Sequence, residues 1–94
     1  MSAPANLLSL AKTSLMIPQA ESYADEELSS LIESALALVK STGVSESHFE
    51  ANEVKSIVLI YVKTFFGFSN DGSVKELPQS FYFLLKQVTL TRGN

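Results

Sequence analysis

Few side chains in this sequence could perform acid–base or nucleophilic chemistry. His48 is the only histidine, and its nearest acids are Glu46 and Glu50 in a short polar stretch. The chain is rich in serine, but no serine stands in the spacing of a nucleophile elbow, which would place it beside a histidine base. We therefore predict that His48 is a solvated surface residue and that the protein has no catalytic residues and is not an enzyme.

Metal and cofactor sites are not indicated either. One histidine and no cysteine give neither a zinc ligand set nor a disulfide. The turn around Asn70, Asp71 and Gly72 lacks the series of carboxylates that a calcium loop needs, and the scattered glycines form no phosphate-binding loop. We expect no metal and no cofactor.

Length and composition indicate a small globular protein. The chain has 94 residues, 46% of them hydrophobic, with a net charge of −3, which gives no general attraction to nucleic acid. Lys12 interrupts the first apolar run, which has no basic start, and Lys55 and Lys63 bracket the apolar middle segment, so neither a signal peptide nor a membrane span is expected. We predict one soluble domain over residues 1–94, with flexible ends at about 1–5 and 89–94.

Two segments early in the chain have the period of amphipathic helices. The first is residues 6–16, with Asn6 as its cap and Ile17-Pro18 as its end. The second is residues 25–43, which starts with three acids, is capped by Ser22 or Asp25, and has Lys40 and then Gly43 at its end. Its apolar residues form one stripe, made of Leu28, Leu31, Ile32, Ala35, Leu36 and Val39.

The third segment, residues 47–68, is unusually apolar. Its hydrophobic arc is wider than the roughly 100° that suffices for a helix lying on one neighbour, so it must be covered from two sides. The stretch "IVLIYV" could also form a buried strand, because β-branched residues favour sheets. The length of the run favours a helix, since strands seldom exceed about 8 residues.

A last helix is predicted after a loop at "SNDGSVKE". Pro78 suits its first turn, Phe81, Leu84, Leu85 and Val88 form its apolar stripe, and "TLTRGN" is an extended tail. The predicted fold is therefore all-α, a small bundle of about four helices in which the long second and third helices pack together. Four short helices cannot easily bury all the aromatic residues, and surplus aromatic surface is typical of interfaces.

Three stretches resemble the head–tail connector proteins, also called head-completion or adaptor proteins, of long-tailed bacteriophages and prophages. They are "LLSLAKTSLMI", "DEELSSLIESALALV", and "VKSIVLIYVKTFF" followed by "LPQSFYFLLKQ", which together span about residues 7 to 90. Many family members follow the third helix with a segment like Tyr/Trp-x-Asn-Arg, whereas this chain reads "FFGFSNDG".

The resemblance implies a structural role in the virion, after assembly in the host cytoplasm. Such proteins form a ring below the portal, of about twelve subunits by the portal's symmetry, although free subunits can be monomeric. The ring completes the head, lets genomic DNA pass without sequence-specific binding, and docks the tail. Its partners would be the portal protein and a tail-completion protein or the next connector.

Two sets of residues are assigned to that assembly. A subunit or partner interface is predicted from the flank of the third helix and the surplus aromatic residues, namely Leu59, Val62, Phe66, Tyr82 and Phe83. An acidic set is predicted to face the channel or the portal, namely Glu21, Asp25, Glu26, Glu27 and Glu33. The plainer interpretation of these acids is a solvated helix start.

Two other functions are compatible with the sequence. A small non-enzymatic helical adaptor or regulator that acts through protein–protein contacts fits the composition equally well. A small DNA-binding helical domain is disfavoured, because the chain has an acidic balance and no basic recognition helix.

Overall fold

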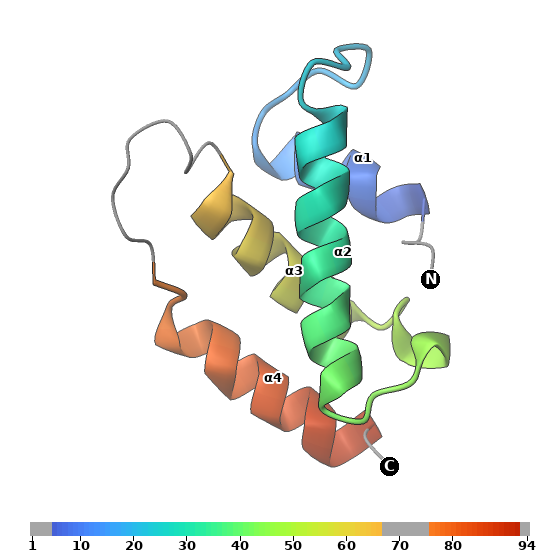
Figure 1. Ribbon diagram of the computed structural model, residues 1–94, viewed down its shortest axis with the longest axis vertical. Helices are drawn as coiled ribbons and strands as arrows, with labels where there is room; N and C mark the ends of the chain where they lie inside the picture. The colour runs from blue at the N-terminus through green and yellow to red at the C-terminus, as the bar shows by residue number, and fades with distance from the viewer. Residues whose placement is uncertain (1–4, 67–75, 93–94) are drawn as a thin grey trace.

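The computed structural model describes residues 5–66 and 76–92, and these form an all-α bundle (Figure 1). Its helices are α1 (Ala5–Ser14), α2 (Asp25–Ser41), α3 (Asn52–Phe65) and α4 (Gln79–Arg92), with a short 3-10 turn, η1 (Glu46–His48), before α3. No β-strand occurs within these ranges. The predicted all-α class is confirmed, and "IVLIYV" lies inside α3.

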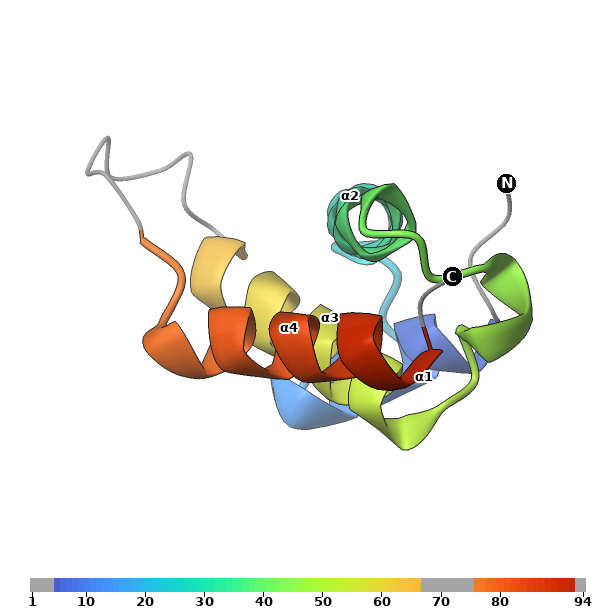
Figure 2. The same ribbon diagram turned by 90° about the horizontal axis from the view of Figure 1, so that it is seen from below.

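The third helix is the centre of the packing. It contacts α2 most extensively and also contacts α4 and α1. Figure 2 shows α2 end-on above the other helices, which lie in one layer beneath it. The expected pairing of the second and third helices is confirmed, and so is the expectation that the apolar arc of α3 is covered from more than one side. Its four fully buried residues are Val54, Ile57, Val58 and Val62.

The second helix buries the stripe that its sequence predicts. All six residues of that stripe except Leu31, which is half-buried, are fully buried. The helix ends at Ser41, and Gly43 follows with a φ of 103°, a backbone conformation that a Cβ disfavours. This glycine reverses the chain so that Val44 enters the core.

Several predicted helix ends are wrong. Asn6 lies inside α1 and does not cap it, because that helix already begins at Ala5. The N-cap of α2 is Ala24, with no side-chain capping bond, so neither Ser22 nor Asp25 caps that helix. The third helix begins at Asn52, later than predicted, because η1 occupies residues 46–48.

The C-terminal part of the chain also differs from the prediction. The predicted extended tail is wrong for residues 89–92, because α4 continues to Arg92. The hydroxyl of Thr89 donates to the Leu85 carbonyl at 2.7 Å, so its hydrogen bond is made within α4. The loop predicted at residues 69–76 and the Phe68 end of the third helix fall largely outside the described residues.

The fourth helix separates a core aromatic residue from an exposed one two positions later. Phe81 is almost fully buried, and its ring centroid lies 6.1 Å from that of Tyr61 on α3. Phe83 is 62% exposed. One face of α4 therefore belongs to the core and another does not.

We expect Phe81→Ala to lower the free energy of unfolding by about 3–5 kcal/mol, because it removes packing and leaves a cavity. The matched variant Phe83→Ala should change it by less than about 0.5 kcal/mol, as for other surface substitutions. Urea denaturation followed by circular dichroism at 222 nm measures both. Equal losses in the two variants would show that α4 does not dock as described.

Candidate assembly surfaces

The ammonium group of Lys12 holds together the first helix, the loop after it and the start of the second helix. Lys12 is only 4% exposed. Its Nζ donates to the Glu21 carbonyl at 2.6 Å and the Gln19 carbonyl at 3.1 Å, and it lies 2.7 Å from Asp25 Oδ1. A buried ammonium needs such compensation, because it has lost its hydration. The two carbonyls accept hydrogen bonds from the group, and the Asp25 carboxylate adds an opposite charge at ion-pair distance.

The backbone of the loop at residues 15–24 is fixed as well. The amide of Ile17 donates to the Lys12 carbonyl at 2.8 Å, and that of Met16 donates to the Thr13 carbonyl at 3.1 Å. This is the bond pattern of a Schellman motif, whose left-handed position favours glycine. Here Met16 occupies it, with a φ of 62°. The loop is therefore held on α1 at the expense of a strained non-glycine residue.

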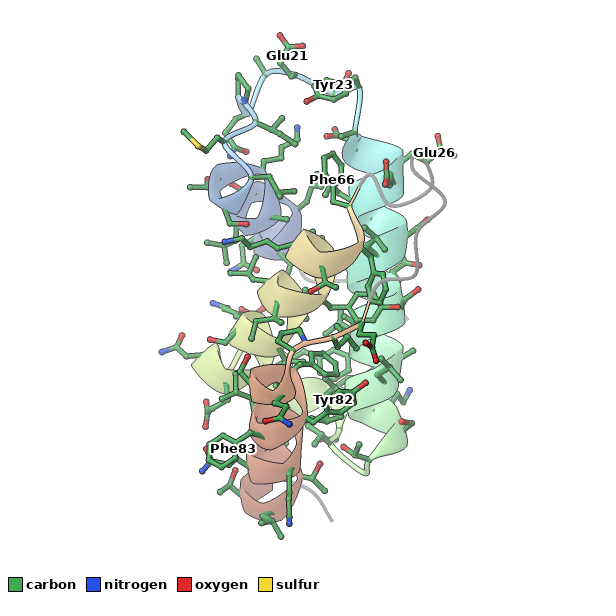
Figure 3. The ribbon with its side chains drawn as sticks, turned by 90° about the vertical axis from the view of Figure 1, so that its left-hand side faces the viewer. Glu21, Tyr23, Glu26, Phe66, Tyr82 and Phe83 are labelled. Carbon is green, nitrogen blue, oxygen red and sulfur yellow. The ribbon has the colours of Figure 1, made fainter. Side chains whose placement is uncertain are left out.

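The loop displays apolar side chains although its backbone is pinned down. Met16 is 90% exposed and Tyr23 is 74% exposed. Figure 3 shows Tyr23 and Glu21 at one end of the molecule, beyond α1 and α2. Sequence analysis missed both apolar residues.

The predicted interface set divides into buried and exposed members. Val62 has no exposed surface, so the core of its own chain covers it and it is not available to another subunit. Leu59 and Phe66 are half-buried and pack against that core. Tyr82 and Phe83 are each more than half exposed, in the half of the molecule away from Tyr23 (Figure 3).

The predicted acidic set divides in the same way. Asp25 is engaged with Lys12, and its Oδ1 is itself inaccessible to solvent. Glu26 and Glu33 are exposed and lie seven residues apart on α2, which places them on the same side of that helix. Glu21 and Glu27 are also exposed. The structure thus presents four of the five acids at the surface.

A second lysine, Lys40, forms an ion pair that is exposed to solvent. Lys40 Nζ lies 2.7 Å from Glu46 Oε2, and both side chains are about half exposed. The hydrogen bond from Lys40, and then its charge, lower the pKa of the Glu46 carboxyl. Any stability gained this way is present above the ordinary pKa of a glutamate and is lost as the pH falls through the lowered one. Solvent screening keeps that gain small.

No chemical centre is evident in the part of the chain that the structure describes. Residues 5–66 and 76–92 contain no group of three or more potential metal-ligating side chains, and no helix there is long and apolar enough to cross a membrane. His48 is half-buried in η1. What the described surface offers is apolar and charged side chains suited to contacts with other proteins.

We expect Lys12→Met to lower the free energy of unfolding by roughly 2–4 kcal/mol, since it leaves two carbonyls and a carboxylate without their partner. Part of the Asp25 side chain reaches water, which limits the loss. The matched variant Lys40→Met breaks the exposed pair and should change stability little. Urea titration measures both, and equal effects would contradict the role given to Lys12.

Comparison with known proteins adds one finding. A family model described as phage connector protein matches residues 7–94. Searches of curated proteins and of solved structures found no significant match. The matched region covers every described residue from Leu7 onward, including Lys12 and the whole of α4.

Proposed function

The chain belongs to the phage connector protein family and is a structural protein of the phage particle, and from that premise we propose that it forms a ring below the portal. In this proposal the ring completes the DNA-filled head, extends the channel through which DNA leaves, and provides the surface on which the tail docks. The family match over residues 7–94 carries the proposal. The same role makes the protein non-enzymatic.

The exposed aromatic residues of α4 support an assembly role. Phe81 and Val88 fill the opposite face of the helix, and Tyr82 and Phe83 stay more than half exposed, although the Tyr82 ring meets the Phe81 ring edge-on at 5.4 Å. Exposed aromatic side chains are enriched where proteins bind each other. We propose that Tyr82 and Phe83, with the accessible parts of Leu59 and Phe66, contribute to contacts with neighbouring subunits or with the portal.

The acids of α2 support a role next to DNA. In a ring of about twelve subunits, a net charge of −3 per chain gives about 12 × −3, or roughly −36. Duplex DNA carries one negative charge per roughly 1.7 Å of its axis, so an acidic wall would let DNA slide past without adhering. We propose that Glu26 and Glu33, with Glu21 and Glu27, face the channel or the rim of the portal. Asp25 does not belong to this set, because it serves the Lys12 site.

The aromatic contact is tested with Phe83→Asp. We expect the variant to fold with unchanged stability and to be incorporated into phage particles at least about fivefold less, because a charge replaces an aromatic contact at an interface. Quantitative mass spectrometry of purified particles measures incorporation. Ser56→Asp, which adds the same charge at an exposed position of α3, is the control.

Normal incorporation of folded Phe83→Asp would remove this residue from the interface. Absence of the unmodified protein from particles would refute the ring itself and favour a helical adaptor that acts elsewhere in the infected cell.

The channel assignment is tested with Glu26→Lys combined with Glu33→Lys. We expect particles with this variant to retain DNA more strongly and to eject it more slowly, with an effect that fades as salt rises. Single-particle ejection assays over a salt series measure it. Glu50→Lys with Glu76→Lys makes the same change of charge at exposed positions outside α2. If the two double variants behave alike, the acids of α2 are only a solvated helix start.

A further inference from the structure

Two exposed apolar surfaces lie in opposite halves of the molecule. We define the loop surface as Met16, Glu21 and Tyr23, and the helix surface as Tyr82, Phe83, Lys86 and Leu90 on α4. Figure 3 places Glu21 and Tyr23 at one end and Tyr82 and Phe83 in the opposite half of the molecule. Each surface contains at least two large apolar side chains that are more than half exposed.

The helix surface is continuous. At about 100° per residue, Lys86 and Leu90 project between the directions of Tyr82 and Phe83, so all four residues fall within an arc of about 100°. Leu90 is 75% exposed. Phe81 and Val88, which are buried, lie on the other side of the helix. The arc is as wide as the apolar stripe with which a helix normally packs on a neighbour, but its members Tyr82, Phe83 and Leu90 are more than half exposed among the residues that the structure describes.

The backbone of the loop surface is held in place. Lys12 donates to the carbonyl of Glu21 and pairs with the carboxylate of Asp25, and the Schellman bonds fix the backbone of Met16. The side-chain amide of Gln19 also donates through Nε2 to the Ser9 carbonyl at 3.0 Å. A loop held in this way loses little backbone conformational entropy when its surface binds. The strain at Met16 would be relieved by glycine, yet the position carries a large, almost fully exposed apolar side chain.

The charges of the two surfaces are opposite. Glu21 is the only charged residue in the loop at residues 15–24, and Lys86 is the only one between Gln79 and Thr91. Both side chains are exposed. Pairing two loop surfaces would bring glutamate against glutamate, and pairing two helix surfaces would bring lysine against lysine. Only the pairing of a loop surface with a helix surface brings opposite charges together.

We propose that the helix surface of one subunit binds the loop surface of a second copy of this chain, in a head-to-tail contact. Lys86 then faces Glu21, and the aromatic residues of α4 cover Met16 and Tyr23. Because the two surfaces differ and lie apart, a pair of bound subunits still has one free loop surface and one free helix surface. Such a contact repeats from one subunit to the next, and it closes into a ring where the rotation between neighbouring subunits divides a full turn. The inference rests on the proposed ring and identifies the surfaces that form it.

Cysteine cross-linking tests the geometry directly, because the natural chain has no cysteine. Ser22→Cys and Gln87→Cys place one thiol at the edge of each surface, at exposed positions that leave the apolar residues intact. The double variant, treated with a short bismaleimide at high protein concentration and within phage particles, should give a ladder of dimers, trimers and larger species. A mixture of the two single variants should stop at dimers. Ser22→Cys with Ser56→Cys is the control pair and should give no ladder.

A second measurement addresses the charges. Glu21→Lys and Lys86→Glu should each reduce the cross-linked oligomers about two- to fivefold, as expected for an exposed ion pair. The variant with both changes should restore them, because it exchanges the two charges. Failure of restoration would overturn the pairing of Glu21 with Lys86.

The remaining outcomes separate this inference from the proposed function. Dimers from either single variant alone would overturn the head-to-tail contact in favour of a two-fold one. Particles that contain the protein but give no ladder would overturn these surfaces while leaving the ring in place. A ladder from purified protein that is absent from particles would support the contact and refute the proposed place in the virion.

Discussion

The buried ammonium of Lys12 is the interaction on which the arrangement of this protein depends. It donates to two loop carbonyls and pairs with the first carboxylate of α2 at once, so the loop can cross from α1 to α2 without a hydrophobic anchor for each residue. An unpaired charge at this position would be very costly, and therefore the loop has essentially one way to close. The Asp25 carboxylate is engaged by this ion pair and makes no capping hydrogen bond to α2.

Next to the loop held by Lys12, the third helix is the element on which the core is built. Its apolar arc is wide enough to contact all three other helices, and α4 uses the face with Phe81 and Val88 to cover it. A chain of this length has little interior, so a helix that covers the core from outside must leave one face in water. That face is where Tyr82, Phe83 and Leu90 accumulate. The exposed aromatic surface of α4 follows from the same packing that buries α3.

The assembly we propose uses two surfaces that remain exposed when the single chain folds. The loop pinned by Lys12 and the outer face of α4 have different shapes and opposite charges, which suits a contact between unlike surfaces more than a symmetric dimer. A small apolar contact of this kind is weak when only two subunits meet. Closure of a ring on a portal would add the contributions of many such contacts, which is compatible with a subunit that is monomeric when free.

The sequence alone determined the helices and the family, because a period of 3.6 residues with consistently placed apolar side chains is a local property of the chain. The stripe of α2 and the wide arc of α3 were readable in this way, as was the surplus of aromatic residues. Helix ends such as Ala5 and Asn52 were not, since caps and short turns compete within a few residues. Only the tertiary structure could decide that Val62 is internal, that Asp25 belongs to Lys12, and that Met16 and Tyr23 stand exposed. Each of these depends on contacts between segments that are far apart in the sequence, and a local sequence pattern does not determine such contacts.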